Sequence, residues 1–178
     1  QSIALENQKD SRVKEGDPFA KAAISQELDR LVDIYRNNGF MRFGREEMIG
    51  LWDTLDISLL RPTFDPLEQL EILQKLKERR ENPTANLEIR LRSDSDSSKL
   101  RKYYIGNINV YPDVTYDTAG IAIKEEIVNG VKVIYHHGIF KPKIFPQNIY
   151  LKRGDLYNQQ KYLRTINRFN SLGAWRLV

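Results

Sequence analysis

Two adjacent histidines, His136 and His137, are the first residues whose type suggests chemistry, because imidazole is a common metal ligand. Neighbouring residues on an extended chain point to opposite faces. The 178-residue sequence has only these two histidines and no cysteine, so nothing completes a usual zinc site. We therefore expect no metal at this pair and no cofactor elsewhere.

Two aspartates, Asp94 and Asp96, lie in the Ser/Asp-rich run at 93–98 and could chelate calcium. A calcium loop needs about six oxygen ligands and an anchoring glutamate, which this run does not supply. The run also has no apolar side chain that could order it. We expect a solvated linker here.

No catalytic set can be recognised in the sequence. Neither a GxxxxGK phosphate loop nor a Gly-x-Ser-x-Gly elbow occurs, and the absence of cysteine removes thiol nucleophiles. Carboxylates are plentiful, but without a pocket the sequence does not indicate which of them pair. We expect no catalytic residues and a protein that is not an enzyme; a buried cluster of charged groups would reopen that alternative.

Nucleic-acid binding is a second alternative. The chain has 28 basic and 24 acidic residues, mostly interleaved, so its net charge of +4 forms no basic stripe in the sequence. Four tyrosines near Arg101 and Lys102 could stack on bases, namely Tyr103, Tyr104, Tyr111 and Tyr116. Strand aromatics more often pack in a core, so we expect no nucleic-acid partner. Two ferredoxin-like domains that bind RNA stay open as an alternative, which salt-sensitive RNA binding would support.

The elements that must position any site begin with a helix. Asp17 is suited to cap it, Pro18 to open it, and Gly39 to stop it in a left-handed conformation. After Gly39, the residues Met41-Arg42-Phe43 read as a short strand. A second helix is expected at 65–81, with Asp65 and Glu68 as a capping box and one apolar stripe of leucines at positions 67, 70, 73 and 76. Apolar and charged residues alternate strictly at 87–91, which predicts a strand.

Beyond the linker the sequence predicts a strand with Tyr104, Gly106, Ile108 and Val110 on one face. A hairpin at 121–135 follows, turning at Asn129-Gly130, a pair favoured in type I′ turns. We expect this hairpin to be an excursion from the fold. A third helix is expected to open at Gly154-Asp155-Leu156-Tyr157 and to end at Gly173, before a strand at 174–178.

An internal repeat emerges when the two halves are compared. Gly16-Asp17-Pro18-Phe19, a helix and Gly39 parallel Gly154-Asp155-Leu156-Tyr157, a helix and Gly173. The two glycines are 23 positions apart in the first copy and 19 in the second, a difference of about one helical turn. The extra four residues of the first copy therefore leave the same side of its helix facing the core.

These motifs resemble the POTRA domain, whose sequences tend to show a Gly-Asp-x-Tyr/Phe entry and a Leu-Gly-x-Phe/Trp exit. Leu172-Gly173-Ala174-Trp175 is similar to that exit, and Tyr35-Arg36-Asn37-Asn38-Gly39-Phe40 is similar to POTRA modules of TamA-like proteins in the BamA superfamily. The resemblance implies an α+β fold of two tandem modules, each ordered strand, helix, helix, strand, strand. It departs from the family at the helix 65–81 and at the hairpin 121–135, which are expected as insertions.

The expected modules are residues 1–92 and 100–178, joined by a linker at 93–99. The second module lacks a counterpart to the strand 87–91, so its last strand is expected to be missing and the chain to be a fragment. In the resembling family, POTRA modules precede a sixteen-stranded β-barrel in the outer membrane. The resemblance thus implies a periplasmic segment attached to the outer membrane through a barrel outside this sequence.

The implied function is to receive unfolded outer-membrane proteins by β-augmentation and to work with other subunits of an assembly machine. The short strands that lie at a sheet edge in the resembling fold are the expected client-binding residues, namely Met41, Arg42, Phe43, Trp175, Arg176 and Leu177. The alternative is that these aromatics pack under a helix. A further alternative is a transporter of the two-partner secretion type, whose POTRA modules recognise one exported partner.

Overall fold

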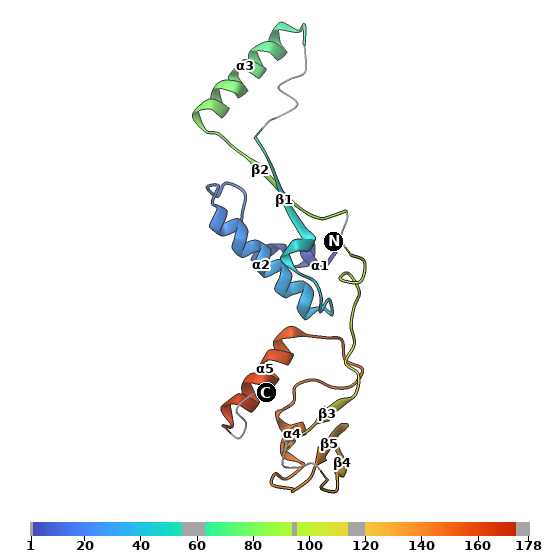
Figure 1. Ribbon diagram of the computed structural model, residues 1–178. Helices are drawn as coiled ribbons and strands as arrows, with labels where there is room; N and C mark the ends of the chain where they lie inside the picture. Colours follow the sequence, from blue (N-terminus) through green and yellow to red (C-terminus); the bar gives the residue numbers. More distant parts are fainter. Residues whose placement is uncertain (1, 55–62, 94–95, 114–119, 174–178) are drawn as a thin grey trace. The chain divides into compact units, whose positions relative to one another are not determined.

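The computed structural model describes residues 2–54, 63–93, 96–113 and 120–173 (Figure 1). It contains both helices and strands, so the expected α+β class is confirmed. Its helices are α1 (Ser2–Glu6), α2 (Lys21–Asn37), α3 (Pro66–Glu81), α4 (Ile144–Asn148) and α5 (Gln159–Ser171), with 3-10 turns η1 (Gln8–Asp10) and η2 (Arg45–Glu47). Its strands are β1 (Met48–Asp53), β2 (Asn86–Leu91), β3 (Ile108–Val110), β4 (Lys124–Val128) and β5 (Val131–Tyr135).

The chain divides into two compact units, neither of which is continuous in sequence. Unit 1 comprises Gln1–Asp10, Asp29–Phe43 and Asp96–Val178, and unit 2 comprises Ser11–Leu28 and Gly44–Ser95. The step from Ser95 to Asp96 falls inside the expected linker 93–99. The grouping of the N-terminal half differs from a single module at 1–92, because α2 begins in unit 2 and ends in unit 1.

Helix α2 begins later than the sequence predicts. Asp17 does not cap it: its carboxylate accepts from the backbone N–H of Lys14 at 2.8 Å, and the first helical residue is Lys21. The expected stop is confirmed, since Gly39 has φ +97° and the N–H of Phe40 donates to the carbonyl of Tyr35 at 3.1 Å. The Tyr35 and Phe40 rings pack edge to face at 5.6 Å. This is the Schellman arrangement with its hydrophobic contact.

Helix α5 repeats the geometry of α2 at both ends. Before each helix, the Asp N–H bonds back to a Lys carbonyl at 3.1 Å, in the turns Lys14-Glu15-Gly16-Asp17 and Lys152-Arg153-Gly154-Asp155. Gly16 and Gly154 have φ +85° and +86°, as the third position of a type II turn requires. Each helix begins five residues after that glycine, and each ends two residues before a glycine of positive φ. The expected helix opening at 154–157 therefore contains a turn that precedes the helix, and the turn, the helix and the positive-φ glycine recur in both copies.

In unit 1, the end of α2 is hydrogen-bonded to the start of α5. The Nδ2 of Asn158 donates to the Asn37 carbonyl at 2.9 Å, and the N–H of Gln160 donates to Asn37 Oδ1 at 2.9 Å. Asn158 also caps α5, because its Oδ1 accepts from the Lys161 N–H at 2.9 Å. Two of the N–H groups that a helix start leaves without intrahelical partners are thus satisfied by asparagine side chains.

The strand expected at Met41-Arg42-Phe43 is wrong. Met41 and Arg42 form a turn, in which the N–H of Phe43 donates to the carbonyl of Phe40 at 3.0 Å. The strand comes five residues later, as β1, and pairs with β2 in antiparallel register from Met48↔Leu91 to Asp53↔Asn86. The chain reverses direction in a tight turn after Gly39, and residues 40–43 form this turn instead of an extended strand.

Helix α3 matches its expected bounds but not its expected face. The carboxylate of Asp65 accepts from the N–H of Leu67 at 2.9 Å, so the cap is confirmed, whereas Glu68 bonds to the hydroxyl of Thr63 and does not complete a capping box. Leucines spaced by three residues fall about 60° short of a full turn at each step, so four of them wind around half the helix. Their exposed fractions range from 46% to 72%.

The hairpin at 121–135 is not an excursion. Its second strand, β5, is the central strand of a sheet ordered β3-β5-β4, parallel to β3 and antiparallel to β4. The turn is as predicted, with Asn129 at φ 50° and Gly130 at φ 79°. The core of this region consists of Val131, Val133, Phe145 and Phe169, with Val133 fully buried. Two valines on one face of β5 make it the strand that the helices cover.

Candidate polypeptide-binding edge

The β1–β2 ribbon of unit 2 has only two strands, so each strand has one side that faces no other strand among the described residues. The Arg92 N–H donates to the Glu47 carbonyl at 2.9 Å, and these residues are opposite each other in the same register. Hydrogen-bonded and non-hydrogen-bonded pairs alternate along an antiparallel ladder. Residues Ile49, Leu51 and Asp53 therefore bond to β2, and Gly50 and Trp52 turn their N–H and C=O groups outward.

Strand β2 shows the same alternation of hydrogen-bonded and non-hydrogen-bonded residues. Its outward N–H and C=O groups are those of Leu87, Ile89 and Leu91. The side chains of that edge differ from those of β1. Glu88 and Arg90 are joined by an ion pair at 2.5 Å, and the hydrogen bond from Arg90 lowers the pKa of the Glu88 carboxyl. Charged side chains on an edge strand disfavour pairing with another chain. Strand β1 has no charged residue between Met48 and Trp52, so it is the less protected edge.

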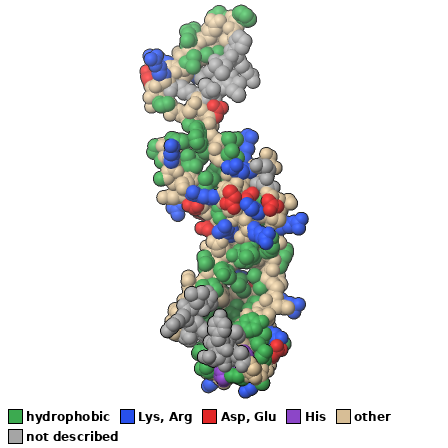
Figure 2. All heavy atoms as spheres, in the orientation of Figure 1, with side chains coloured by type: hydrophobic (Ala, Val, Ile, Leu, Met, Phe, Trp, Pro, Cys, Tyr) green, Lys and Arg blue, Asp and Glu red, His purple; other side chains and the backbone are tan. Residues whose placement is uncertain are grey.

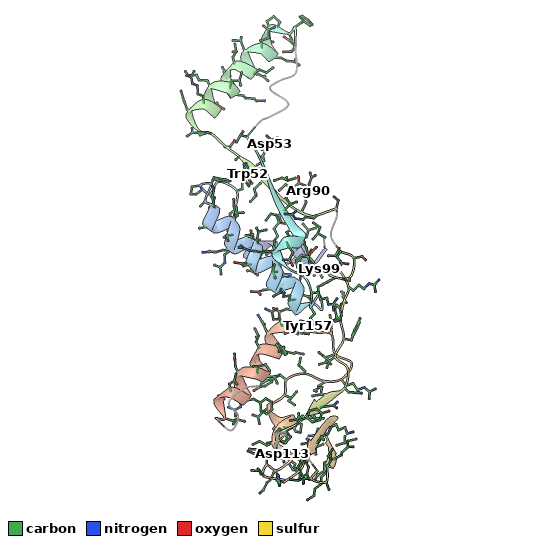
Figure 3. All side chains as sticks on the ribbon, viewed as in Figure 1. Trp52, Asp53, Arg90, Lys99, Asp113 and Tyr157 are labelled. Carbon is green, nitrogen blue, oxygen red and sulfur yellow. The ribbon has the colours of Figure 1, made fainter. Side chains whose placement is uncertain are left out.

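Apolar side chains lie on both faces of β1. Trp52, labelled in Figure 3, is 60% exposed and packs edge to face on Phe19 at 6.0 Å. Ile49 and Leu51, at alternate positions of the strand, are exposed on the opposite face. Met48 is buried at the other end of the strand. An incoming strand would therefore find backbone partners at Gly50 and Trp52 and apolar contacts on either side.

The sheet of unit 1 offers less open edges. Strand β3 has three residues, and β4 carries Lys124, Glu125 and Glu126. Glu125 is paired with Lys132 at 2.8 Å, and Glu126 accepts from the hydroxyl of Tyr135 at 2.6 Å, which raises the pKa of Tyr135. A short edge strand and charged side chains on it both disfavour pairing with a strand of another chain.

Of the expected client-binding residues, the three that the structure describes, Met41, Arg42 and Phe43, do not form a strand edge. Phe43 is fully buried and stacks on Tyr35 at 4.5 Å, whereas Met41 is exposed in the turn. The Arg42 guanidinium lies 5.8 Å from the centroid of the Tyr103 ring. Trp175, Arg176 and Leu177 lie outside the described residues. For Phe43, the alternative of packing beneath a helix describes its contacts better.

Strand β1 was not predicted from the sequence, which places a short strand at 41–43 instead. The 3-10 turn η2 takes up only the three residues before β1. The signal for a strand was present in the sequence, since Met48-Ile49-Gly50-Leu51-Trp52 is an uncharged run with β-branched and aromatic residues.

The histidine pair has a structural partner. Asp113 accepts from the backbone N–H groups of His136 and His137, at 3.0 and 2.8 Å, and lies 3.3 Å from the Nδ1 of His136. Burial alone would raise the pKa of Asp113, but these hydrogen bonds outweigh it and hold the pKa below its ordinary value. The carboxylate of Asp113, which is labelled in Figure 3, thus connects the segment after β3 to the residues that follow β5.

The remaining chemical candidates have local roles. Asp96 accepts from both the N–H and the hydroxyl of Ser98 at 2.8 Å, which lowers its pKa, and Asp94 lies outside the described residues. Tyr104 and Tyr111 are exposed, and Tyr116 is not among the residues described. Within the part of the chain that the structure describes, no three metal-ligating side chains gather. Acidic and basic side chains lie next to each other on the face seen in Figure 2.

Comparisons with protein-family models, with curated proteins and with solved structures find no match to this chain. Among the described helices, none combines the length and the apolar character that crossing a membrane requires.

Proposed function

We propose that this chain is a polypeptide-binding segment built from two POTRA modules, belonging to an outer-membrane assembly factor of the BamA/TamA type and acting in the periplasm. Its clients are unfolded outer-membrane proteins, which it receives by β-augmentation without catalysing a reaction. It also binds other subunits of the assembly machine and is attached to the outer membrane through a barrel outside this sequence. Client strands of many sequences can be received because main-chain bonds supply the affinity.

The observation that carries the proposal is the edge of β1. Its outward N–H and C=O groups at Gly50 and Trp52 have no partner among the described residues, and its side chains from Met48 to Trp52 are uncharged. Proteins usually protect such an edge with charge or proline. The repeated turn, helix and glycine stop in the two halves support the tandem arrangement.

Amide hydrogen exchange of the chain with a peptide from an outer-membrane β-strand tests the proposal. We expect the peptide to slow exchange at the Gly50 and Trp52 amides, because these donate to the incoming strand. The amides of Ile49 and Leu51 already donate to β2, and we expect little change there. Equal protection of all four amides, or none at any, would contradict binding at this edge.

A matched pair of variants identifies the strand that binds. Gly50→Pro removes an outward N–H from β1, and Ile89→Pro removes the equivalent group from β2; proline is tolerated at such edge positions. Loss of one hydrogen bond of about 1 kcal/mol weakens peptide binding roughly fivefold. We expect this loss for Gly50→Pro alone, measured by fluorescence anisotropy of a labelled peptide. A greater loss for Ile89→Pro would place the edge on β2.

A further inference from the structure

Contrary to our expectation, the basic and acidic residues are not interleaved throughout the chain: an excess of positive charge lies in one stretch of unit 1. Residues 139–173 contain seven Lys or Arg and one Asp, a net charge of +6. The whole chain has 28 basic and 24 acidic residues and a net charge of +4, so the remaining residues have 21 basic and 23 acidic side chains and a net charge of −2. A stretch of strongly basic character therefore belongs to a chain that is otherwise slightly acidic.

Helix α5 presents three of these cations on one side. Its 13 residues include Lys161, Arg164 and Arg168 and neither Asp nor Glu. At about 100° per residue, these three positions fall within about 60° of one another around the helix. All three side chains are exposed, whereas Thr165 and Phe169 are buried on the neighbouring side. The cations thus form one exposed row beside the packed face of the helix.

Both arginines of this row are held by contacts with the segment before α5. The Arg164 guanidinium lies 4.1 Å from the centroid of the Tyr150 ring, and Nε of Arg168 donates to Oδ1 of the buried Asn148 at 2.8 Å. The other guanidinium nitrogens of Arg168 have no partner within the described residues. Side chains that are already positioned lose less conformational entropy when they bind an anion.

We infer that this basic row of α5, formed by Lys161, Arg164 and Arg168, binds the phosphate headgroups of an anionic lipid surface. A guanidinium presents several donors in a plane that matches the oxygens of a phosphate. The row contains no acidic residue; the carboxylate of Asp155, which is partly exposed, lies 3.8 Å from Lys161. This surface belongs to unit 1, and its binding does not depend on the β1 edge of unit 2.

A lipid surface fits the described residues better than a nucleic acid does. Proteins that bind single strands stack bases on open aromatic faces, but Arg164 already covers a face of the Tyr150 ring. Apolar side chains are exposed in the same stretch but not in the row itself: Leu163, about 100° or more around α5 from each cation, is 46% exposed, and Ile139, before α4, is 70% exposed. Cations together with exposed apolar groups are typical of segments that lie at a membrane interface.

Sedimentation of the full chain with vesicles tests the inference. The vesicles contain equal parts of phosphatidylcholine and phosphatidylglycerol, or phosphatidylcholine alone. We expect binding to the anionic vesicles only, and we expect it to fall steeply between about 0.1 M and about 1 M salt, as the screening length shortens from about 10 to about 3 Å. Equal binding to neutral vesicles, or none to either, would overturn the inference.

The triple variant Lys161→Gln, Arg164→Gln, Arg168→Gln removes the row. Each cation near an anionic surface contributes roughly fivefold, so we expect about a hundredfold weaker vesicle binding. The control Lys75→Gln, Lys77→Gln, Arg80→Gln removes the same charge from exposed positions on α3 and is expected to bind within about threefold of the unmodified chain. Equal losses in the two variants would show a net-charge effect and would overturn the assignment to α5.

Loss of the arginine contacts could unfold the triple variant, which circular dichroism would reveal. A second variant, Lys152→Gln, Arg153→Gln, Lys161→Gln, leaves Tyr150 and Asn148 with their partners and is expected to weaken vesicle binding in the same direction. A short RNA is tested in parallel. Binding to RNA that is lost in the variants, without vesicle binding, would assign the row to nucleic acid and contradict the proposal.

Discussion

Two separate requirements call for glycine at position 39: the backbone conformation and the close packing of a neighbouring side chain. Its φ of +97° is in the left-handed region that favours glycine, and a Cβ at this position would lie 2.7 Å from Cδ1 of Leu156. Gly154 has a similar φ of +86° but would have nothing within 4 Å of its Cβ. The pair therefore separates the cost of backbone strain from the cost of a clash.

We predict that Gly39→Ala lowers the free energy of unfolding by about 2–4 kcal/mol, of which about 1–2 kcal/mol is backbone strain. Gly154→Ala should lose only the strain. Urea denaturation of both variants measures the difference, and Gly39→Ala combined with Leu156→Ala should recover part of the clash. Equal losses at the two glycines would show that Leu156 moves aside at little cost.

Asp113 is the residue whose contribution depends most clearly on pH. Its side chain is 7% exposed and accepts hydrogen bonds from His136 and His137, which keep its folded-state pKa below the ordinary value of 3.8. A carboxyl with a lowered pKa stabilises the fold above its unfolded pKa, and this contribution disappears as the pH falls through the folded pKa.

We predict that Asp113→Asn destabilises the chain by about 1–2 kcal/mol at pH 7, because charge-assisted hydrogen bonds become neutral ones. The difference from the unmodified chain should shrink as the pH falls below about 3.8, the ordinary aspartate value. Urea denaturation across this range measures it. A difference that stays constant with pH would mean that Asp113 acts through packing alone.

At the scale of elements, the start of α5 is stabilised from two directions. Asn158 caps the helix with its Oδ1 and donates from Nδ2 to the carbonyl of Asn37, so one side chain serves both helices. Aspartate at this position keeps an acceptor for the cap and loses the donor. Alanine loses both.

We predict that Asn158→Ala destabilises the chain by about 1.5–2.5 kcal/mol, the sum of a cap and a hydrogen bond. Asn158→Asp should lose only about 0.5–1.5 kcal/mol, because the cap is retained. Thermal unfolding followed by circular dichroism compares the two. If the aspartate variant is as unstable as the alanine variant, the hydrogen bond to Asn37 outweighs the cap.

At the scale of the whole molecule, apolar burial is uneven among the described residues. Strand β5 contains the fully buried Val133, which packs with Phe145 and Phe169, whereas the leucines of α3 are all exposed. Most helical stability in proteins comes from packing an apolar face, and few apolar contacts mark segments that open easily.

We predict that amide exchange is slowest in β5 and α5 and fastest in α3, measured by hydrogen–deuterium exchange with mass spectrometry. Replacing Leu70 by Ala in α3 should change the free energy of unfolding by less than about 0.5 kcal/mol, while Phe145→Ala should cost about 3–5 kcal/mol. Protection of α3 equal to that of β5 would mean that its leucines are covered in solution.

Local sequence was sufficient for the features that depend on a few neighbouring residues. The glycine stop at Gly39, the Asp65 cap, the Asn129-Gly130 turn and the alternating strand β2 all follow their predictions. Each rests on a backbone preference or a hydrogen bond within about five residues of its origin. The spacing of the internal repeat is also seen in the structure, because the glycines that define it lie in such local turns.

Only the tertiary structure decided which residues pair over long distances. The sequence pattern at 41–43 suggested a strand, but the chain turns there, and the open edge belongs to β1, whose partner β2 begins more than thirty residues later. The hairpin expected as an excursion supplies the central strand, and the arginines of α5 contact Tyr150 and Asn148 of the preceding segment. Strand partners depend on register, which cannot be read from neighbouring residues alone.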